Sequence, residues 1–243
     1  MMGLKKIAGF IALLFSLPAL SQAVDGKNLI KFNLSSLAFK GFSLQYERQL
    51  SQKITVAMSY GMVPLSSIPY KSYIEKQVFF PDADIGSFRL GTYIFTPEAR
   101  YYFGKKGAFH GFYLAPYTRI SSYKIKGPIV YSANSGSKEN ADFAGNLKAI
   151  TGGIMAGSSW QLSNRFYLDW WIAGAGFGGE SGRFTTNEQL TPGDQASLKR
   201  KLDSISLSGI TLSSAVSSNG AIVTTSGSIA GLRGFGINFG IRF

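Results

Sequence analysis

The sequence predicts an all-β fold, an eight-stranded antiparallel up-and-down transmembrane β-barrel with long extracellular loops. First, eight segments place apolar side chains at every second position, the period of a strand with two different faces. Second, 45% of the residues are hydrophobic although the mean hydropathy is only +0.07. Third, short and long connections alternate along the chain, as they do in outer-membrane barrels.

The segment 232–243 shows the alternation most clearly. Phe235, Ile237, Phe239, Ile241 and Phe243 fall on one face, and glycine, asparagine and arginine fall on the other. An apolar ribbon opposite a small and polar one suits a wall between lipid and a polar lumen. A strand that ends on an aromatic residue is typical of the closing strand of such a barrel.

Residues 1–23 have the pattern of a secretory signal peptide. Lys5 and Lys6 precede an apolar run over 7–20, and Ser21 and Ala23 provide small residues before a cleavage site. The run is shorter than the roughly 20 residues that span a bilayer. We therefore expect export, removal of 1–23, and a barrel of residues 24–243 in the cell outer membrane. The absence of cysteine excludes a lipoprotein anchor and disulfides.

Strands of about 9–11 residues are long enough to cross the hydrocarbon when tilted. Pro97 and Pro116 are misfits, because proline cannot donate to the ladder, so a bulge or irregular pairing is expected at each. A soluble barrel would turn its apolar face inward, but the opposite face here is rich in glycine, serine and charge. The predicted strands are 28–36, 41–50, 54–62, 91–103, 111–123, 147–162, 165–177 and 232–243.

The connections predict the topology. With the N-terminus in the periplasm, each short link falls on the periplasmic side and each long link outside, apart from the short outer link 36–40. The short links are 51–53, 104–110 and 163–164, and the long ones are 63–90, 124–146 and 178–231.

The extracellular insertion at about 178–231 has predicted structure of its own. Thr191–Asp194 resembles a capping box with proline at the first helical position. Leu198, Leu202 and Ile205 follow at helical spacing, which predicts a short basic amphipathic helix. Segments 204–216 and 221–230 flank Asn219-Gly220, a hairpin signal. They form an extracellular hairpin or two further membrane strands, which would give ten; broken alternation at 209–210 favours eight.

Charged side chains are expected inside the barrel. Four of them lie at a similar depth when counted from the periplasmic strand ends, and they suit either a proton relay or a static ion-pair network. The network is favoured, because so narrow a barrel is filled by its own side chains and an unpaired buried charge is costly. The projected set is Lys31, Glu47, Glu98, Arg100, Arg119, Asp169 and Arg242.

Net charge points to the partners. The formal charge of +12, less the two lysines of the signal peptide, leaves +10. Such a balance could suit nucleic acid, but export argues against it. Outer-membrane lipids and lipopolysaccharide phosphates are the expected partners.

No catalytic, cofactor-binding or metal site is predicted. His110 falls in a periplasmic turn, the wrong side for chemistry on lipid A acyl chains, and no zinc-type ligand cluster exists. Trp160, Trp170 and Phe166 suit an aromatic girdle. The sequence predicts a non-enzymatic barrel with a structural or surface-interaction role through its extracellular loops. A narrow solute pore and, less favoured, a lipid A-modifying enzyme are the alternatives. The extracellular partner stays open.

Residues 96–103 and 110–114 resemble a family of small outer-membrane barrels from Bacteroidetes that carries only a domain-of-unknown-function label. Residues 152–157 and 160–168 resemble its next hairpin. The resemblance covers about 27–178 and the last strand, whereas 183–230 depart from the family pattern. It implies an eight-stranded barrel and no known activity. It also implies that the barrel assembly machinery reads Phe239, Ile241 and Phe243 as an assembly signal.

Overall fold

The computed structural model describes residues 26–68 and 85–243, so the predicted signal peptide and residues 69–84 lie outside it. None of the described helices is long and apolar enough to cross a membrane. The elements are β1 (Asn28–Asn33), α2 (Ser35–Ala38), β2 (Phe42–Gln49), β3 (Ile54–Ser67), η1 (Ile85–Ser87), β4 (Arg89–Tyr102), β5 (Gly111–Ser132), β6 (Lys138–Gln161), β7 (Phe166–Thr186), α4 (Pro192–Asp203), β8 (Ile210–Ser217) and β9 (Gly220–Arg242).

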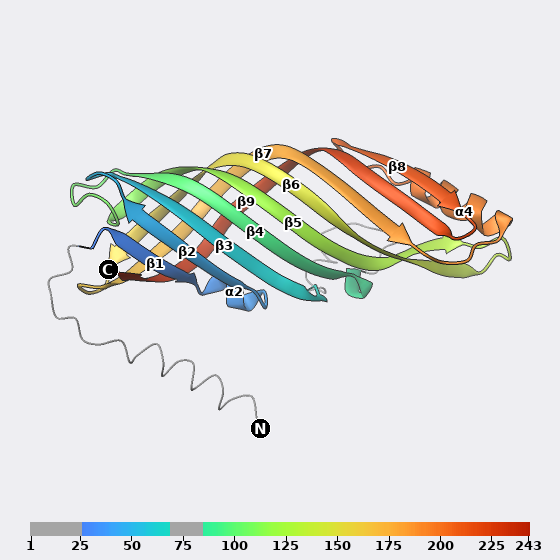
Figure 1. Ribbon diagram of the computed structural model, residues 1–243, viewed down its shortest axis with the longest axis horizontal. Helices are drawn as coiled ribbons and strands as arrows, with labels where there is room; N and C mark the ends of the chain where they lie inside the picture. Colours follow the sequence, from blue (N-terminus) through green and yellow to red (C-terminus); the bar gives the residue numbers. More distant parts are fainter. Residues whose placement is uncertain (1–25, 69–84) are drawn as a thin grey trace, which may run out of the picture.

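Eight antiparallel strands close into a ring, which confirms the predicted fold class (Figure 1). Each strand from β1 to β6 pairs with the next, β7 pairs with β9, and β9 returns to β1. The closing seam runs from Leu29–Arg242 to Asn33–Asn238. Among the described strands β8 pairs with β9 alone, so the ten-stranded alternative is wrong. We call the barrel end that holds Phe243 proximal and the opposite end distal.

The ring turns its apolar side chains outward. On β3, Ile54, Met58 and Tyr60 are 41–50% exposed, whereas the intervening Thr55 and Ser59 are buried. On the other strands the exposed apolar side chains likewise alternate with buried or small ones. We call these outward apolar residues the apolar belt. A belt of this kind needs an apolar solvent, and a closed ring leaves no strand edge unpaired there.

Four strands are much longer than predicted. β5, β6, β7 and β9 have 22, 24, 21 and 23 residues. The predicted connections 124–146 and 178–231 are therefore wrong as loops, since most of their residues are strand or helix. The alternation of lipid-facing residues stops where a strand leaves the membrane, but backbone pairing does not. At the other extreme, β1 ends at Asn33, before its predicted end, and the chain turns into α2.

The strand extensions form a distal lobe, defined here as 124–146, 178–186, α4, β8 and 220–228. In Figure 1 it projects beyond the ring at the end opposite the C-terminus. Leu198 and Leu202 of α4 are fully buried in a separate core with Tyr131, Phe143 and Val223. The predicted helix and hairpin are both confirmed, although the second hairpin strand is the start of β9.

Irregular pairing occurs where the prolines predict it, between β3 and β4 at Val63–Ser66, and between β6 and β7. The β4–β5 pairing is interrupted around Pro97 and Pro116 without a change of register. In β7, Ile172 has no partner on β6, because Ala173 faces Ala156 while Trp171 faces Gly157. The paired position on β9 is Phe235, with φ of 54°. On the proximal side of this double irregularity the inward residues have odd numbers in β7 and even numbers in β9. On the distal side the reverse holds.

Candidate functional site in the barrel interior

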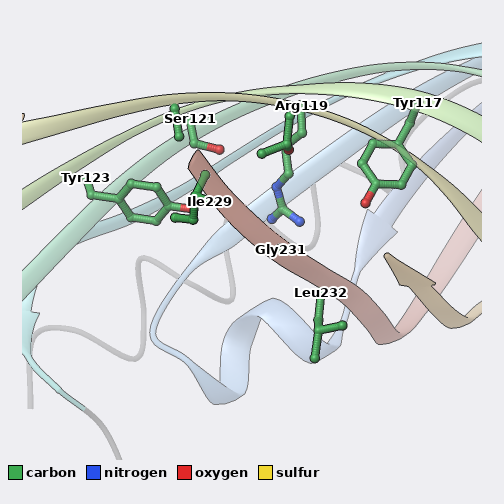
Figure 2. A pocket seen from close by; sticks show the side chains of 9 residues that line it. Tyr117, Arg119, Ser121, Tyr123, Ile229, Gly231 and Leu232 are labelled. Atoms are coloured by element: carbon green, nitrogen blue, oxygen red, sulfur yellow. The ribbon is translucent and has the colours of Figure 1, made fainter. Parts of the chain in front are cut away.

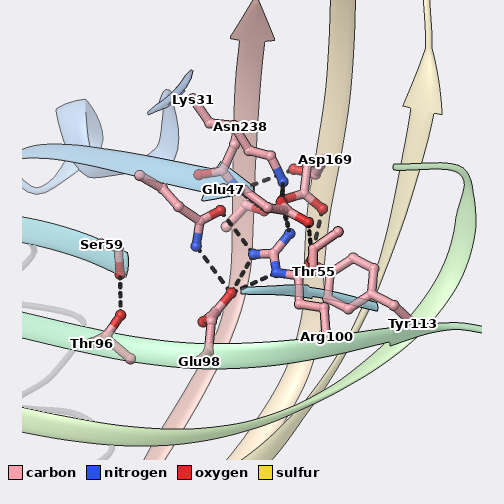
Figure 3. Close-up of polar contacts among 12 residues, drawn as sticks. Lys31, Glu47, Thr55, Ser59, Thr96, Glu98, Arg100, Tyr113, Asp169 and Asn238 are labelled. Carbon is pink, nitrogen blue, oxygen red and sulfur yellow. Dashed lines mark hydrogen bonds and ion pairs between the residues drawn. The ribbon is translucent and has the colours of Figure 1, made fainter. Parts of the chain in front are cut away.

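Ionised side chains meet inside the proximal half of the ring (Figure 3). Lys31 Nζ donates to Glu47 Oε2 at 2.5 Å and to Asp169 Oδ2 at 2.7 Å. Arg100 Nη1 donates to the same two oxygens, at 2.9 Å each. Two cations from β1 and β4 thus share two carboxylates from β2 and β7.

The network continues through Glu98. Arg100 Nε donates to Glu98 Oε1 at 2.6 Å, and Arg233 of β9 pairs with the other oxygen of the same carboxylate. Gln45 accepts from Arg100 Nη2 at 2.8 Å and donates to Glu98 at 3.0 Å. A single guanidinium, that of Arg100, therefore joins both halves of the network.

Charge in the network is balanced, and its carboxylate oxygens are saturated. Three cations (Lys31, Arg100, Arg233) face three anions (Glu47, Glu98, Asp169), each at most 5% exposed. Thr55 and Tyr102 donate to Glu47 Oε1 at 2.5 and 2.8 Å, and Tyr113 donates to Asp169 Oδ1 at 2.8 Å. Buried charges are tolerated when paired and hydrogen-bonded in this way. The geometry suits a static network better than a proton relay, because each carboxylate oxygen already accepts a hydrogen bond.

On the proximal side of the network, aromatic side chains fill the end of the barrel. Phe109, from the β4–β5 turn, is fully buried against Tyr102 and Tyr167, with Leu29 in the same cluster. His110 lies in this turn, where its ring contacts Ala108 O at 2.9 Å and Gln161 Oε1 at 3.0 Å. The described residues include no group of three or more side chains that could hold a metal ion.

Five of the predicted interior charges come together, and two lie elsewhere. Arg242 sits at the proximal end, where it donates to Gly26 O at 2.6 Å and to Tyr167 Oη at 3.1 Å. Arg119 lies on the distal side of the network. Sequence reasoning missed Arg233, because uninterrupted alternation on the last strand points it outward. The glycine-rich run 231–236 is the available signal, since glycine within a strand often marks a bulge.

Arg119 lines a cavity of about 100 Å³, whose lining residues are drawn in Figure 2. Its lining combines polar and apolar side chains, and Nε of Arg119, like Nη2 of Arg233, is buried without a hydrogen-bond partner among the described residues. The volume holds a few water molecules. On the distal side of the balanced network the lumen thus holds Arg119, and the buried carboxylate of Glu180 lies one inward row further on. The lining residues are Tyr117, Arg119, Ser121, Tyr123, Ala149, Thr151, Ile229, Gly231 and Leu232.

A closed ring with an apolar exterior and an ion-paired interior defines the class, an eight-stranded barrel of the outer-membrane type. The chain belongs to a family described as proteins of unknown function, DUF3575, whose model matches residues 9–197. The match runs into α4, so the predicted departure from the family pattern is wrong for residues 183–197. A search of curated proteins finds no match.

Solved outer-membrane barrels are also similar. The N-terminal barrel domain of Pseudomonas aeruginosa OprF shares 12% identity, over 90% of this chain and 98% of that chain, with a TM-score of 0.25. Neisserial surface protein A shares 13% identity, over 89% of this chain and 94% of that chain, with a TM-score of 0.31. Acinetobacter baumannii CarO2 shares 12% identity, over 90% of this chain and 99% of that chain, with a TM-score of 0.40. These scores are low, so the barrel assignment rests on the strand pairing of this chain.

Proposed function

We propose that the chain is an integral protein of the cell outer membrane, exported through a cleaved signal peptide at 1–23. We propose further that it is non-enzymatic and has a structural or surface-interaction role exerted through its distal lobe. The apolar belt supports membrane insertion, because a closed barrel is the β-structure that satisfies its backbone groups in lipid. Origin in Bacteroidetes, which the family resemblance implies, stays a prediction.

The distal lobe is the observation that carries the role. A membrane crossing needs about 9–11 residues per strand, and the additional length of β5, β6, β7 and β9 builds the lobe. α4 is held in place by Asp194, which accepts from the Asn134 backbone N–H at 3.0 Å, and by its two buried leucines. An internally packed lobe presents a fixed surface, as recognition requires, rather than a set of mobile loops.

The orientation of the lobe tests this proposal directly. The chain has no cysteine, so single cysteines give a clean signal. Ser135→Cys lies in the exposed β5–β6 turn of the lobe, and Lys105→Cys lies in the exposed proximal β4–β5 turn. A membrane-impermeant maleimide should label the first variant in intact cells and the second only after lysis. The reverse pattern, or equal labelling in intact cells, would refute the proposal. Photo-cross-linking from position 135 then searches for a partner.

The proximal half argues against the alternative of a solute pore. The six charges and the aromatic cluster below them are almost entirely buried, which leaves no wide water path through that section. We expect the protein in planar bilayers to show no steady conductance. Stable single-channel steps that Arg100→Ala changes in size would instead support the pore.

The enzyme alternative has less support. His110 is the chain's one histidine, and it lies at the proximal end, far along the barrel from the outer leaflet of the proposed orientation. Mass spectra of lipid A from cells with and without the protein should be identical. A change in acyl or phosphate content that depends on the protein would overturn the non-enzymatic assignment.

A further inference from the structure

Basic side chains gather on the outer wall where the apolar belt ends distally and the distal lobe begins. The wall cluster, as we call it, consists of Arg89 (β4), Lys124 and Lys126 (β5), Lys148 (β6) and Arg183 (β7), all exposed. Lys124 and Lys148 lie an even number of positions from the exposed belt residues Ile120 and Ile150, so they point outward as well.

Strand register brings these residues together. Arg89 lies directly opposite Lys126. Lys124 faces Asn146, and Asn146 faces Arg183 on its other side. Like charges directly opposite each other destabilise a sheet, so the cluster favours a bound counter-charge. No ion pair between described residues involves these five.

Among the residues that the structure describes, carboxylates are missing from this part of the wall. From the belt up to the cluster, the outward positions of β4–β7 hold aromatic, aliphatic, small, amide or basic residues. The nearest outward acid of the described strands is Asp142, further along β6 opposite Pro128 and therefore further from the belt than the cluster. The wall thus presents a concentrated positive charge at one depth.

An apolar groove adjoins the cluster on its membrane side. It has a volume of about 390 Å³ and is lined mainly by outward side chains of the belt, with Lys148 at its edge. Tyr60, Phe95, Ile120 and Ile150 form one row across four neighbouring strands, and the row of Tyr93, Ser122 and Lys148 follows it. A lipid chain lying along the wall would meet the apolar row first and the basic residues next.

We propose that this surface binds a phosphorylated glycolipid of the outer leaflet, with phosphate on the wall cluster and an acyl chain in the groove. Charge complementarity identifies the headgroup, since guanidinium and ammonium groups are the usual partners of phosphate in proteins. Position identifies the source, because the cluster lies at the edge of the apolar belt, the depth of a headgroup. The inference rests on the proposed membrane location and adds a defined ligand site to it.

The test compares two variants with equal loss of charge. Lys124→Gln/Lys126→Gln/Lys148→Gln removes three charges from the wall cluster. Lys53→Gln/Lys105→Gln/Lys106→Gln removes three exposed charges at the proximal end. Binding of bisphosphorylated lipid A to protein in zwitterionic detergent is measured by native mass spectrometry. We expect the first variant to bind roughly 10- to 100-fold more weakly, and the control to bind like the wild type.

Two further arms identify the chemistry. Dephosphorylated lipid A should bind the wild-type protein as weakly as lipid A binds the cluster variant. Excess inorganic phosphate should fail to displace lipid A, and Ile150→Trp, which fills the groove, should weaken binding without loss of charge. Equal affinities of the cluster and control variants, indifference to the lipid phosphates, or displacement by free phosphate would each overturn the site. If the lipid A test fails while maleimide labels Ser135→Cys and not Lys105→Cys in intact cells, the proposed function still stands. If the labelling pattern is reversed, the proposed function is refuted whatever the lipid A test shows.

Discussion

Arg100→Ala should be among the most destabilising substitutions in this barrel. The guanidinium makes four hydrogen bonds, to Glu98, Glu47, Asp169 and Gln45. Its removal leaves three buried carboxylates facing two cations, so one negative charge loses its counter-charge in the lumen. Breaking a buried pair costs about 3–5 kcal/mol. Since Arg100 bridges all three acids, we expect a loss of stability at or above the upper end of this range.

The assay is reversible denaturant unfolding in detergent or lipid vesicles, followed by tryptophan fluorescence, with heat-modifiable gel migration as a check on folding. Lys105→Ala, in an exposed turn, is the control and should stay within about 0.5 kcal/mol of wild type. Arg100→Met separates charge from volume. Adding Glu98→Gln to Arg100→Met restores charge balance and should recover part of the loss. An Arg100→Ala cost no larger than that of the control would mean the network is solvated and the reasoning wrong.

Three further predictions concern the lobe and the closing seam. Leu202→Ala opens a cavity in the lobe core and should cost the lobe about 2–5 kcal/mol, seen as faster proteolysis of α4 with unchanged barrel migration on gels. Hydrogen bonds from the Thr191 hydroxyl and the Asn134 N–H lower the pKa of Asp194. The stability that the ionised Asp194 carboxylate gives to α4 is present above the ordinary carboxyl pKa and is lost as the pH falls through the lowered pKa. Acid should therefore speed hydrogen exchange in α4, and Asp194→Asn should abolish this pH dependence. Deleting 241–243 removes pairs to both β1 and β7 and should block membrane insertion, which cell fractionation measures; normal levels of folded protein in the outer membrane would contradict it.

The fold was predictable from the sequence because the membrane imposes a simple rule on each strand. Met58 and Tyr60 face lipid while Thr55 and Ser59 face the lumen, and the alternation that results is local and readable. Beyond the belt this rule no longer applies. The extension of β5 to Ser132 was missed because its outward residues contact water, so nothing in their hydropathy separates strand from loop.

The interior network was predictable in part for the same reason. Lys31, Glu47, Glu98, Arg100 and Asp169 all lie on regular stretches, where counting in twos from an apolar residue gives the correct face. Depth could also be counted, because the short proximal turns fix the strand ends. The tyrosine hydroxyls that complete the network, such as those of Tyr102 and Tyr113, gave no such signal, since tyrosine also populates the apolar belt.

The double irregularity in β7 and β9 is needed for the charge balance of the interior network. Uninterrupted strands would place Lys31 and Arg100 against three buried acids and leave one carboxylate without a counter-charge. The extra residues at Ile172 and Phe235 change the parity of β9 and turn Arg233 inward, onto the free oxygen of Glu98. Its guanidinium also lies 4.4 Å from the Trp171 ring, which helps to hold it there. The bulge therefore supplies the third cation that neutralises the network, a role that neither Arg119 nor Arg242 fills.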